Sequence, residues 1–452
     1  MYKKLTSFDE AVDFLFSFVD YEKINKYKYS IKHFNLERIE ELMGWLGDPH
    51  LRFPAVHIAG TKGKGSTALM ARAVLGALGK RAGLYTQPHL TDMTERVTVD
   101  GEPIPRKTVV DIVNEMGPRV HGLRMEKPYE SPTFFDLITA VAFKYFAMRE
   151  VDFGVVEVGL GGRLDSTNVC APAVCAIARL DYDHMDRLGG TLDKIAFEKA
   201  GIIKPGVPVV SWPQPPEAEP VLERVAAERG SPLYWIGRDL VVSEIRAEFD
   251  QGPELCFDIQ GRLNAYNGLR LPLLGRHQAL NAALAVGALE CMAEAGRIEL
   301  PPDRVRKGLA DARCPARMEP FAGRPLILLD GAHNVVSIRG VCEVIDERLA
   351  GRRIVLVFGV ASDKDFEGML DLILPRVSRV VFTKSDSPRA LEPEELVELA
   401  RERGFDNAGA CDTPANAFAR AKELAGPDDV ILITGSFYVA GMIRPMLVDA
   451  PQ

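Results

Sequence analysis

Short runs of apolar residues alternate along this chain with longer segments whose apolar residues recur at helical spacing. In the first half, the apolar runs cover residues 53–59, 151–158 and 173–178, and the helical spacing covers residues 66–78 and 134–146. Uninterrupted apolar runs are typical of strands buried on both faces, and such strands usually form parallel sheets connected by helices. The pattern therefore predicts an α/β fold in which helices flank a mostly parallel sheet.

The middle of the chain departs from this pattern. A proline-rich stretch at residues 212–220 precedes short runs at 241–249 and 254–259, in which apolar and polar residues alternate. Alternation of this kind is typical of strands that bury one face. We therefore expect a small antiparallel patch beside the main sheet, within residues 206–262.

The last third of the chain resumes the alternation of strands and helices. Its apolar runs cover residues 326–330, 354–358, 380–383 and 430–434. They follow residues 312–325, which are rich in Pro, Arg and small residues, as is typical of a domain boundary. We therefore predict an N-terminal domain at residues 1–312 and a smaller, Rossmann-like α/β domain at residues 313–452.

The composition is that of an ordinary soluble protein. Of the 452 residues, 47% are hydrophobic and 26% are charged, and the 55 Lys and Arg against 63 Asp and Glu give a net charge of −8. This mildly acidic balance argues against broad binding to nucleic acid or to an anionic membrane. The uncharged stretch at residues 430–443 is too short to span a bilayer and is interpreted as a buried strand and turn.

The N-terminal segment and the cysteines indicate a cytoplasmic protein. Asp9, Glu10 and Asp13 interrupt the apolar residues near the N-terminus, which favours an amphipathic helix over a secretion signal. The seven cysteines are odd in number and scattered, and no C-x-x-C pair occurs. We therefore expect a reducing compartment and no zinc site.

A glycine-rich turn is the strongest candidate for chemistry. The predicted strand VHIA continues into AGTKGKGST and then into a predicted helix, an order that lets backbone N–H groups and a helix N-terminus hold phosphates. The strict P-loop pattern fails, because Ile58 stands where a glycine is expected and Gly65 separates Lys64 from the hydroxyl of Ser66. The concentration of glycines, lysines and hydroxyl residues at one turn nevertheless favours a nucleotide site over a plain connection. Lys64 would contact phosphate, and Ser66 would reach Mg²⁺.

Three further segments of the N-terminal domain place polar residues at the ends of predicted strands or on helices near them. Glu157 ends the strand in VVEVGLGGRLDSTN and is a candidate metal ligand, although a glycine-rich turn alone is weak support. His184 and Lys199 follow the next strand, where a structural histidine and a solvated lysine are the ordinary alternatives. Asn281 lies on a predicted helix with His277 and could present its amide to a purine, or it could simply be exposed.

The smaller domain contributes its own candidates. The motif ILLDGAHN ends a strand with Asp330 and places His333 and Asn334 before a helix, a position that forms binding sites in doubly wound sheets. Arg317 lies in the predicted linker and could reach a phosphate.

In this order, the motifs resemble those of one family over nearly the whole chain. They are FNLERI, AGTKGKGST, QPHLTDMTERV, EVGLGGRLDSTN, DHMDRLGGTLDKIAFEKAGIIK, GRHQALNAALA, LDGAHN and TGSFYVAG. The chain resembles the dihydrofolate synthase and folylpolyglutamate synthase family, the folate branch of the Mur-type ATP-dependent amide ligases. The resemblance implies an N-terminal P-loop-type ATPase domain, which also binds the folate, and a C-terminal glutamate-ligase domain.

The activity implied by this resemblance is the ligation of L-glutamate to dihydropteroate, to reduced folates, or to both. ATP and Mg²⁺, with two ions expected, would serve an acyl-phosphate intermediate. Such chemistry needs charge neutralisation and in-line positioning but no protein nucleophile. The family also implies small-molecule substrates and a monomer. A Mur-type ligase for another carboxylate and a non-catalytic P-loop switch protein are the alternatives.

The resemblance also implies roles for individual residues. Ser66, Glu157 and His184 match Mg²⁺ ligands, and Lys199 matches a lysine that, when carbamylated, ligates the second ion. The residues with an implied catalytic role are Lys64, Lys199 and His333. The implied ATP site consists of Gly60, Thr61, Lys62, Gly63, Lys64, Gly65, Ser66, Thr67, Asn281, Arg317 and Asp330.

The implied folate and glutamate contacts are Gln87, His89, Phe135, Asp165 and Ser436. Phe135 matches a ring that stacks on the pterin, and Asp165 matches a carboxylate that binds its amino edge, although a core phenylalanine and a loop-capping aspartate are equally open. Two positions depart from the family pattern. Lys62 stands where Asn is usual, and Gln87 stands where Ser is usual, so the phosphate loop and the folate loop both differ here.

Overall fold

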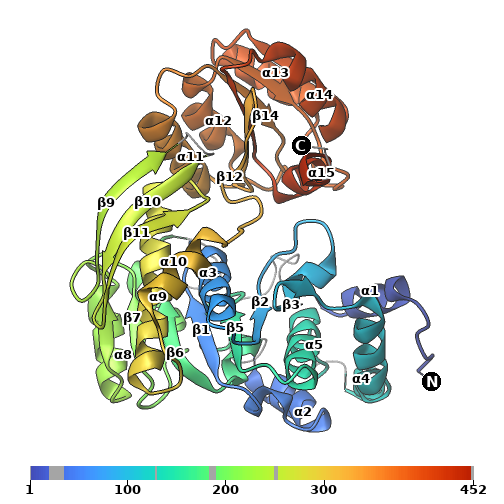
Figure 1. Ribbon diagram of the computed structural model, residues 1–452. Coiled ribbons are helices and arrows are strands. Elements are labelled where there is room, and N and C mark those ends of the chain that lie inside the picture. The colour runs from blue at the N-terminus through green and yellow to red at the C-terminus, as the bar shows by residue number, and fades with distance from the viewer. Residues whose placement is uncertain (1, 20–34, 128–129, 183–189, 249–252, 449–452) are drawn as a thin grey trace.

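The computed structural model describes residues 2–19, 35–127, 130–182, 190–248 and 253–448. Figure 1 shows two α/β lobes, the lower one N-terminal and the upper one C-terminal, with a curved antiparallel sheet rising along one side. Among the helices that the structure describes, none combines the length and the apolar character needed to cross a bilayer. All seven cysteines carry free thiols, and six of them are buried.

An eight-stranded sheet forms the centre of the N-terminal lobe, in the order β4-β3-β2-β5-β1-β6-β7-β8. Its strands are β1 (Ala55–Ala59), β2 (Ala82–Tyr85), β3 (Val97–Val99), β4 (Glu102–Pro103), β5 (Phe153–Glu157), β6 (Pro172–Ile177), β7 (Val209–Ser211) and β8 (Leu233–Trp235). The neighbouring strands β2, β5, β1, β6, β7 and β8 pair in parallel. The strands β3 and β4 add an antiparallel edge next to β2. The predicted mostly parallel sheet is confirmed.

Two layers of helices bury the two faces of this sheet. One face packs against α3 (Lys64–Ala77), α9 (Arg276–Glu294) and α10 (Pro302–Ala310), which share a core with Val56 and Ile58 of β1. The other face is covered by α1 (Phe8–Phe16), α2 (Leu36–Trp45), α4 (Arg106–Glu126), α5 (Phe134–Met148), α7 (Leu192–Ala200) and α8 (Glu219–Glu228). Because successive side chains of a strand point to opposite faces, the apolar run of β1 serves both layers.

The expected antiparallel patch is a three-stranded sheet of β9 (Val241–Glu248), β10 (Glu254–Gln260) and β11 (Ala265–Leu271). The first two strands match the predicted runs. The third was not predicted, because its polar residues and Gly268 dilute the alternation. Short 3-10 helices complete the lobe at η1 (Pro49–Leu51), η2 (Met93–Arg96) and η3 (Ser166–Val169).

The C-terminal lobe is built on a six-stranded sheet in the order β12-β13-β17-β14-β15-β16. Its strands are β12 (Glu319–Phe321), β13 (Leu326–Leu329), β14 (Ile354–Phe358), β15 (Arg379–Phe382), β16 (Ala408–Ala410) and β17 (Val430–Thr434). Its helices are α11 (Val335–Arg348), α12 (Phe366–Ile373), η4 (Leu374–Arg376), α13 (Pro393–Glu402), α14 (Pro414–Leu424) and α15 (Phe437–Val448). The Rossmann-like alternation is confirmed.

Two local expectations in this lobe are wrong. The segment at residues 312–325 is not only a linker, because it contains β12, which pairs antiparallel with β13. Glu319 anchors this strand through an ion pair with Arg444 at 2.8 Å, a partner far away in sequence. The stretch at residues 430–443 is a strand followed by most of a helix rather than a strand and turn, since α15 begins at Phe437.

Candidate active site

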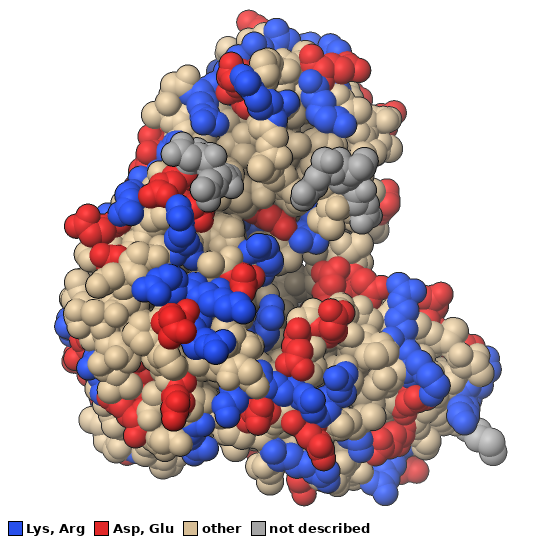
Figure 2. Space-filling model, in the orientation of Figure 1, with Lys and Arg blue, Asp and Glu red and all other residues tan. Residues whose placement is uncertain are grey.

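A cleft of about 1190 Å³ lies between the carboxyl edge of the eight-stranded sheet and the C-terminal lobe. Its walls are the loops after β1, β2, β5 and β6 from one side and after β13 and β17 from the other. Figure 2 shows the hollow between the lobes, with basic and acidic side chains along its rim. Ligands of parallel α/β sheets bind at this edge, where the strands end together.

The glycine-rich turn connects β1 to α3 and opens into the cleft. Gly63 has a φ of +88°, a left-handed conformation that favours glycine, and a side chain there would have to displace the amide of Asn281 on α9. The backbone N–H groups of Thr61 and Lys62 donate to the carbonyl of Arg179 at 2.9 and 3.1 Å. Lys64 donates from Nζ to the carbonyl of Gly60 at 3.0 Å. The turn is thus fixed to the neighbouring strand end before any phosphate binds.

Glu157 ends β5 next to this turn and is nearly inaccessible to solvent. Its Oε2 accepts a hydrogen bond from the backbone N–H of Gln87 at 3.1 Å, the one donor that reaches it among the described residues. Burial raises the pKa of Glu157, and the positive charge of Lys64 opposes this rise. The carboxylate therefore lies beside the phosphate turn with acceptor capacity left over.

Ser66 and Lys199 approach the same turn from two helices. Ser66 lies buried in the first turn of α3 and lines the cleft with Glu157. Lys199 lies buried on α7 and donates from Nζ to the carbonyl of Gly60 at 2.9 Å, so it is not a solvated helix lysine. His184 lies outside the described residues.

A second group of side chains lines the cleft on the side of β2 and α5. The ring of Phe135 is half-buried and stacks near Tyr85, with 6.3 Å between ring centroids. Arg96 donates from Nε to Nδ1 of His89 at 2.9 Å and from Nη1 to Oε1 of Gln87 at 3.5 Å. Since a guanidinium only donates, this contact turns the Gln87 oxygen toward Arg96, and the buried Nε2 has no partner among the described residues.

Asp165 also borders the cleft, but its carboxylate serves its own loop. Its Oδ2 accepts from the N–H groups of Gly159 and Leu160 at 3.1 and 2.9 Å, and its Oδ1 accepts from the N–H and Oγ1 of Thr167 at 3.0 and 2.5 Å. Burial raises the pKa of Asp165 to about 6, against the effect of these hydrogen bonds. Four hydrogen bonds use the usual acceptor capacity of a carboxylate, which supports the loop-capping alternative for this residue.

The C-terminal lobe brings a compact set of groups to the opposite wall. Arg317 lies over the ring of Phe437, with 4.4 Å to the centroid, and the ring of His333 meets the same phenylalanine edge-on. Asp330 accepts from the N–H groups of Met318 and Ala332 at 2.7 and 2.8 Å. Burial lowers the pKa of His333 to about 4, so this imidazole is neutral at physiological pH.

The structure brings most of the predicted site residues into this single cleft. The lining includes Thr61, Lys62, Gly63, Lys64, Gly65, Ser66, Gln87, His89, Phe135, Glu157, Asp165, Asn281, Arg317, Asp330, His333 and Ser436. Gly60, Thr67 and Lys199 lie outside this lining.

Several cleft residues were missed from the sequence. Arg96, Arg179, Trp212 and Phe437 line the cleft as well. Arg96 and Phe437 fall within motifs that were recognised, TERV and GSFYVAG, whereas no pattern marks Trp212.

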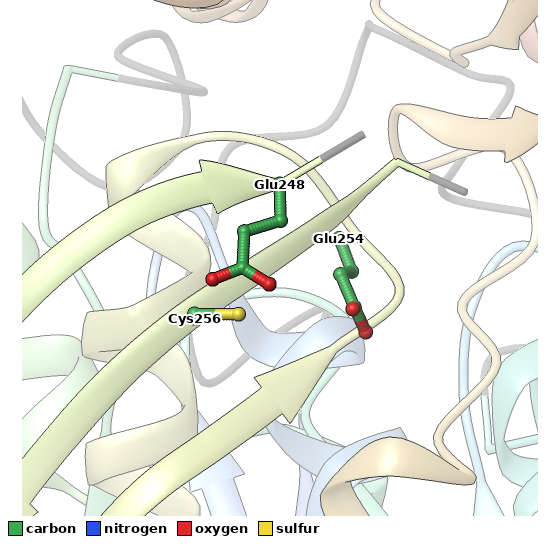
Figure 3. Close-up of side chains that lie close together, drawn as sticks. All are labelled: Glu248, Glu254 and Cys256. Carbon is green, nitrogen blue, oxygen red and sulfur yellow. The ribbon is translucent and has the colours of Figure 1, made fainter. Parts of the chain in front are cut away.

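Outside the cleft, one cluster of potential metal ligands occurs among the described residues, formed by Glu248, Glu254 and Cys256 near the end of the curved sheet (Figure 3). Its carboxylates already have cationic partners. Arg270 contacts Glu248 and Glu254 at 2.6 and 2.7 Å, and Arg246 contacts Glu248 at 3.1 Å. This arrangement favours an ion-pair network over a metal site.

Comparison with known proteins decides the family. Residues 58–289 match the Mur ligase middle domain, and residues 316–437 match the Mur ligase, glutamate ligase domain. The chain is 35% identical over 421 residues to a dihydrofolate synthase/folylpolyglutamate synthase of Bacillus subtilis, which covers 93% of this chain and 96% of the relative. The chain belongs to the dihydrofolate synthase/folylpolyglutamate synthase family. It is therefore an ATP-dependent ligase that forms amide bonds.

Solved structures of this family agree with the fold. A folylpolyglutamate synthase of Thermotoga maritima aligns with a TM-score of 0.86 and 34% identity over 98% of this chain and 97% of its own. A folylpolyglutamate synthase in complex with AMPPCP and folate aligns with a TM-score of 0.80 and 32% identity over 98% of this chain and all of its own. The resemblance inferred from the motifs is confirmed.

Proposed function

We propose that this ligase joins L-glutamate to dihydropteroate, to reduced folates, or to both, through an acyl phosphate. The observation that carries the proposal is the single cleft in which the phosphate turn and Glu157 on one lobe face Arg317, Asp330 and His333 on the other. In the family complex, AMPPCP and folate bind one protein together. A carboxylate that attacks the terminal phosphate of ATP needs this convergence of positive charge and positioned acceptors.

In the first step, a carboxylate oxygen of the folate attacks the γ-phosphorus and ADP leaves. Lys64 and the backbone N–H groups of the turn that follow Lys62 bind the phosphates, and Arg317 adds charge from the opposite lobe. In the second step, the amine of glutamate attacks the acyl carbon and inorganic phosphate leaves. His333 and Ser436 face the cleft where that amine would enter, and contact between the lobes would exclude water from the acyl phosphate.

The donor set at the turn fits Mg²⁺, which prefers oxygen ligands. Ser66 offers a hydroxyl and Glu157 a carboxylate whose Oε1 accepts no hydrogen bond within the described ranges. His184 would complete this first set, and Lys199, if carbamylated, would offer oxygens to a second ion. A carbamylated lysine keeps one N–H, so the bond from Lys199 to Gly60 fits that form too. The metal would neutralise phosphate charge when bound.

On the acceptor side, Phe135 offers a ring to the pterin, and Gln87 and His89 lie on the adjoining loop. We propose that Asp165 positions its own loop at residues 159–167, because this loop already supplies four donors to its carboxylate. Lys62 lines the cleft and would add charge near the phosphates. We further propose that the protein is a cytoplasmic monomer whose domains are residues 1–312 and 313–452.

The direct test is glutamate-dependent release of ADP, with mass analysis of products, from ATP, Mg²⁺ and either dihydropteroate or tetrahydrofolate. Glutamylated product from either acceptor supports the proposal and shows which reaction occurs. ADP release that ignores both acceptors would contradict it and would favour another carboxylate substrate.

Lys64→Ala tests the phosphate turn in this assay, and Lys107→Ala is its matched control. Removal of the phosphate contact should lower the rate at least about 100-fold. Lys107→Ala, at an exposed lysine paired with Asp111 on α4, should leave the rate unchanged. Incorporation of labelled bicarbonate into wild-type protein but not into Lys199→Ala would establish the carbamate.

A further inference from the structure

Phe437 is a half-buried aromatic residue in the wall that the C-terminal lobe gives to the cleft. It is the first residue of α15, it packs against the apolar core of that lobe, and it lines the cleft. The guanidinium of Arg317 and the imidazole of His333 both lie against its ring. One ring therefore contacts two groups of the proposed reaction centre.

The side chain of Arg317 rests on this ring with its donors available. The guanidinium carbon lies 4.4 Å from the ring centre of Phe437, and none of the side-chain N–H groups donates to a residue that the structure describes. A cation over an aromatic face is attracted by the negative charge of the ring face. Burial raises the pKa of Glu157 on the other lobe, and the charges of Lys64 and Arg317 oppose this rise. Phe437 thus supports a guanidinium whose charge acts across the cleft.

The imidazole of His333 is fixed at the edge of the same ring. The two ring centroids are 5.8 Å apart, and the ring planes make an angle of 60°. Nδ1 of His333 lies 2.9 Å from the carbonyl oxygen of Gly331, and because a carbonyl only accepts, Nδ1 carries the proton and donates. Burial lowers the pKa of His333 to about 4, and the charges of Lys62, Lys364 and Arg317 act in the same direction, against the Gly331 hydrogen bond. Nε2 is therefore an unprotonated acceptor.

The backbone around the ring fixes its place relative to both groups. A Cβ on Gly331 would lie 2.8 Å from the ring of Phe437, so the ring lies directly on this glycine. Gly331, two residues before His333, donates from its N–H to the carbonyl of Ala316 at 2.9 Å. Ala316 directly precedes Arg317 in the chain. The two segments that carry the guanidinium and the imidazole are thus bonded to each other, and the ring lies against both side chains.

We propose that Phe437 is a positioning residue of the ligase, which fixes Arg317 and His333 relative to each other. The guanidinium then donates to phosphate oxygens of the acyl phosphate, while Nε2 of the imidazole accepts a hydrogen bond from the neutral amine of glutamate. The amine nitrogen bonds to the acyl carbon, and the bond from this carbon to the phosphate oxygen breaks. Phosphate leaves with the electron pair and with the proton that the nitrogen releases. This inference rests on the proposed function.

The test compares steady-state rates of wild type, Phe437→Leu and Phe437→Tyr with the folate acceptor that wild type uses. Phe437→Leu keeps an apolar side chain and removes the ring, so kcat should fall about five- to tenfold while the KM for the folate is unchanged. Phe437→Tyr keeps the ring, and its kcat should stay within about twofold of wild type. An unchanged kcat in Phe437→Leu, or an equal loss in Phe437→Tyr, would overturn the inference.

Phe418→Leu is the matched control. Phe418 lies on α14 with 3% exposure, belongs to the same apolar core and has Nζ of Lys422 4.8 Å from its ring centre. It lies outside the described lining of the cleft. Phe418→Leu therefore removes the same kind of contact from the same core, and it should lower the melting temperature and leave kcat unchanged. An equal loss of kcat in Phe418→Leu and Phe437→Leu would show a general effect of packing and would overturn the inference.

A double-mutant cycle shows whether Phe437 acts through Arg317. In the Arg317→Ala background, the effect of Phe437→Leu on kcat should shrink to about twofold, because one of the two positioned groups is already absent. A loss as large as in the wild-type background would overturn the link between the ring and the guanidinium.

Histidine NMR gives a readout that needs no substrate. The pKa of His333, about 4 in wild type, should rise toward the ordinary 6.5 in Phe437→Leu, because water then reaches the imidazole and Arg317 loses its support. His333→Gln assigns the resonance among the eight histidines. The pKa should stay low in Phe437→Tyr and Phe418→Leu. An unchanged pKa in Phe437→Leu would overturn the positioning of the imidazole.

Two further outcomes are distinguishable. If Phe437→Leu does not fold, Gly331→Ala replaces it, because its Cβ would displace the ring without removing it. It should give the same fall in kcat and the same rise in the pKa of His333, and wild-type values of both would overturn the inference. If wild-type protein glutamylates neither acceptor, the proposed function itself fails, whereas the NMR result still tests the contact between Phe437 and His333.

Discussion

Glu157 is the last residue of β5 and Asp165 lies in the loop that follows, and both border the cleft, yet their surroundings differ. Burial raises the pKa of each carboxyl group. Asp165 accepts four hydrogen bonds from its own loop, whereas Glu157 accepts one among the described residues. A buried carboxylate whose acceptor capacity is used locally maintains a conformation. One that keeps capacity beside a phosphate turn is suited to a ligand.

The largest expected effect follows from removing the charge of Glu157. Glu157→Gln should lower kcat at least about 100-fold, because a proposed metal ligand is lost, while the melting temperature stays near that of wild type. Steady-state rates and thermal unfolding measure the two quantities. Glu290→Gln is the control, since Glu290 is buried away from the cleft and accepts from three backbone N–H groups and from Tyr266. Glu290→Gln should lower the melting temperature and leave kcat unchanged. An unchanged melting temperature with a lower kcat would contradict the comparison.

The next effect concerns stability. Asp165→Asn replaces one carboxylate oxygen with an NH₂ group that faces the donors of the loop and cannot accept from them. The free energy of unfolding should therefore fall by about 2 kcal/mol. Chemical denaturation measures this change. Asp428→Asn, at a highly exposed ion pair with Arg324, should change it by less than about 0.5 kcal/mol. If Asp165→Asn were as stable as wild type but unable to bind folate, direct substrate contact would be the better account.

The raised pKa of Asp165 also predicts a pH dependence. Its folded-state pKa of about 6 exceeds the ordinary value of 3.8, so the folded protein holds this proton more tightly than the unfolded chain. The contribution of Asp165 to stability is therefore fully present below pH 3.8 and is lost as the pH rises through about 6. The stability of wild type relative to Asp165→Asn should fall by at most about 1.4 kcal/mol per pH unit in this window. Denaturation series at several pH values test the slope, and a rising slope would contradict the assignment.

The smallest effect is expected at Gln87, in the loop after β2 whose backbone N–H binds Glu157. Gln87→Ser keeps the backbone N–H that binds Glu157 and removes only the weak side-chain contact with Arg96 at 3.5 Å. The KM for the folate should change about two- to fivefold, and the KM for ATP should not change. Initial-rate measurements with each substrate varied in turn give both constants. A large loss of kcat would show that this side chain takes part at the phosphate site.

Much of the fold was predictable because its signals are local. The run at residues 173–178 became β6 (Pro172–Ile177), and the turn at AGTKGKGST lies between β1 and α3 as expected. Such strands are buried on both faces and have to be apolar throughout. The strand β12 was hidden in a proline-rich segment, because its pairing with β13 and the ion pair between Glu319 and Arg444 involve residues that composition does not connect.

The candidate site, like the fold, was predictable in part from local sequence and in part only from the tertiary structure. The motifs identified the family and supplied most of the residues that line the cleft. Whether a given residue has a binding role or a structural role depended on which groups surround it in the folded protein. Lys199 is buried against Gly60 rather than solvated, and Asp165 is surrounded by donors of its own loop. Arg96 lies in the cleft from within a recognised motif that did not single it out, and Trp212 lines the cleft from a segment without any motif.

The sequence by itself determined the α/β class, the phosphate turn and the family, because periodicity and motif order are properties of contiguous residues. The tertiary structure alone decided which buried polar groups have partners. Asp165 has its donors in place, whereas Glu157 keeps an acceptor oxygen available. The physical reason is that a hydrogen bond is satisfied or left open by groups that meet only after long-range packing, and a buried group left open is costly unless a ligand completes it.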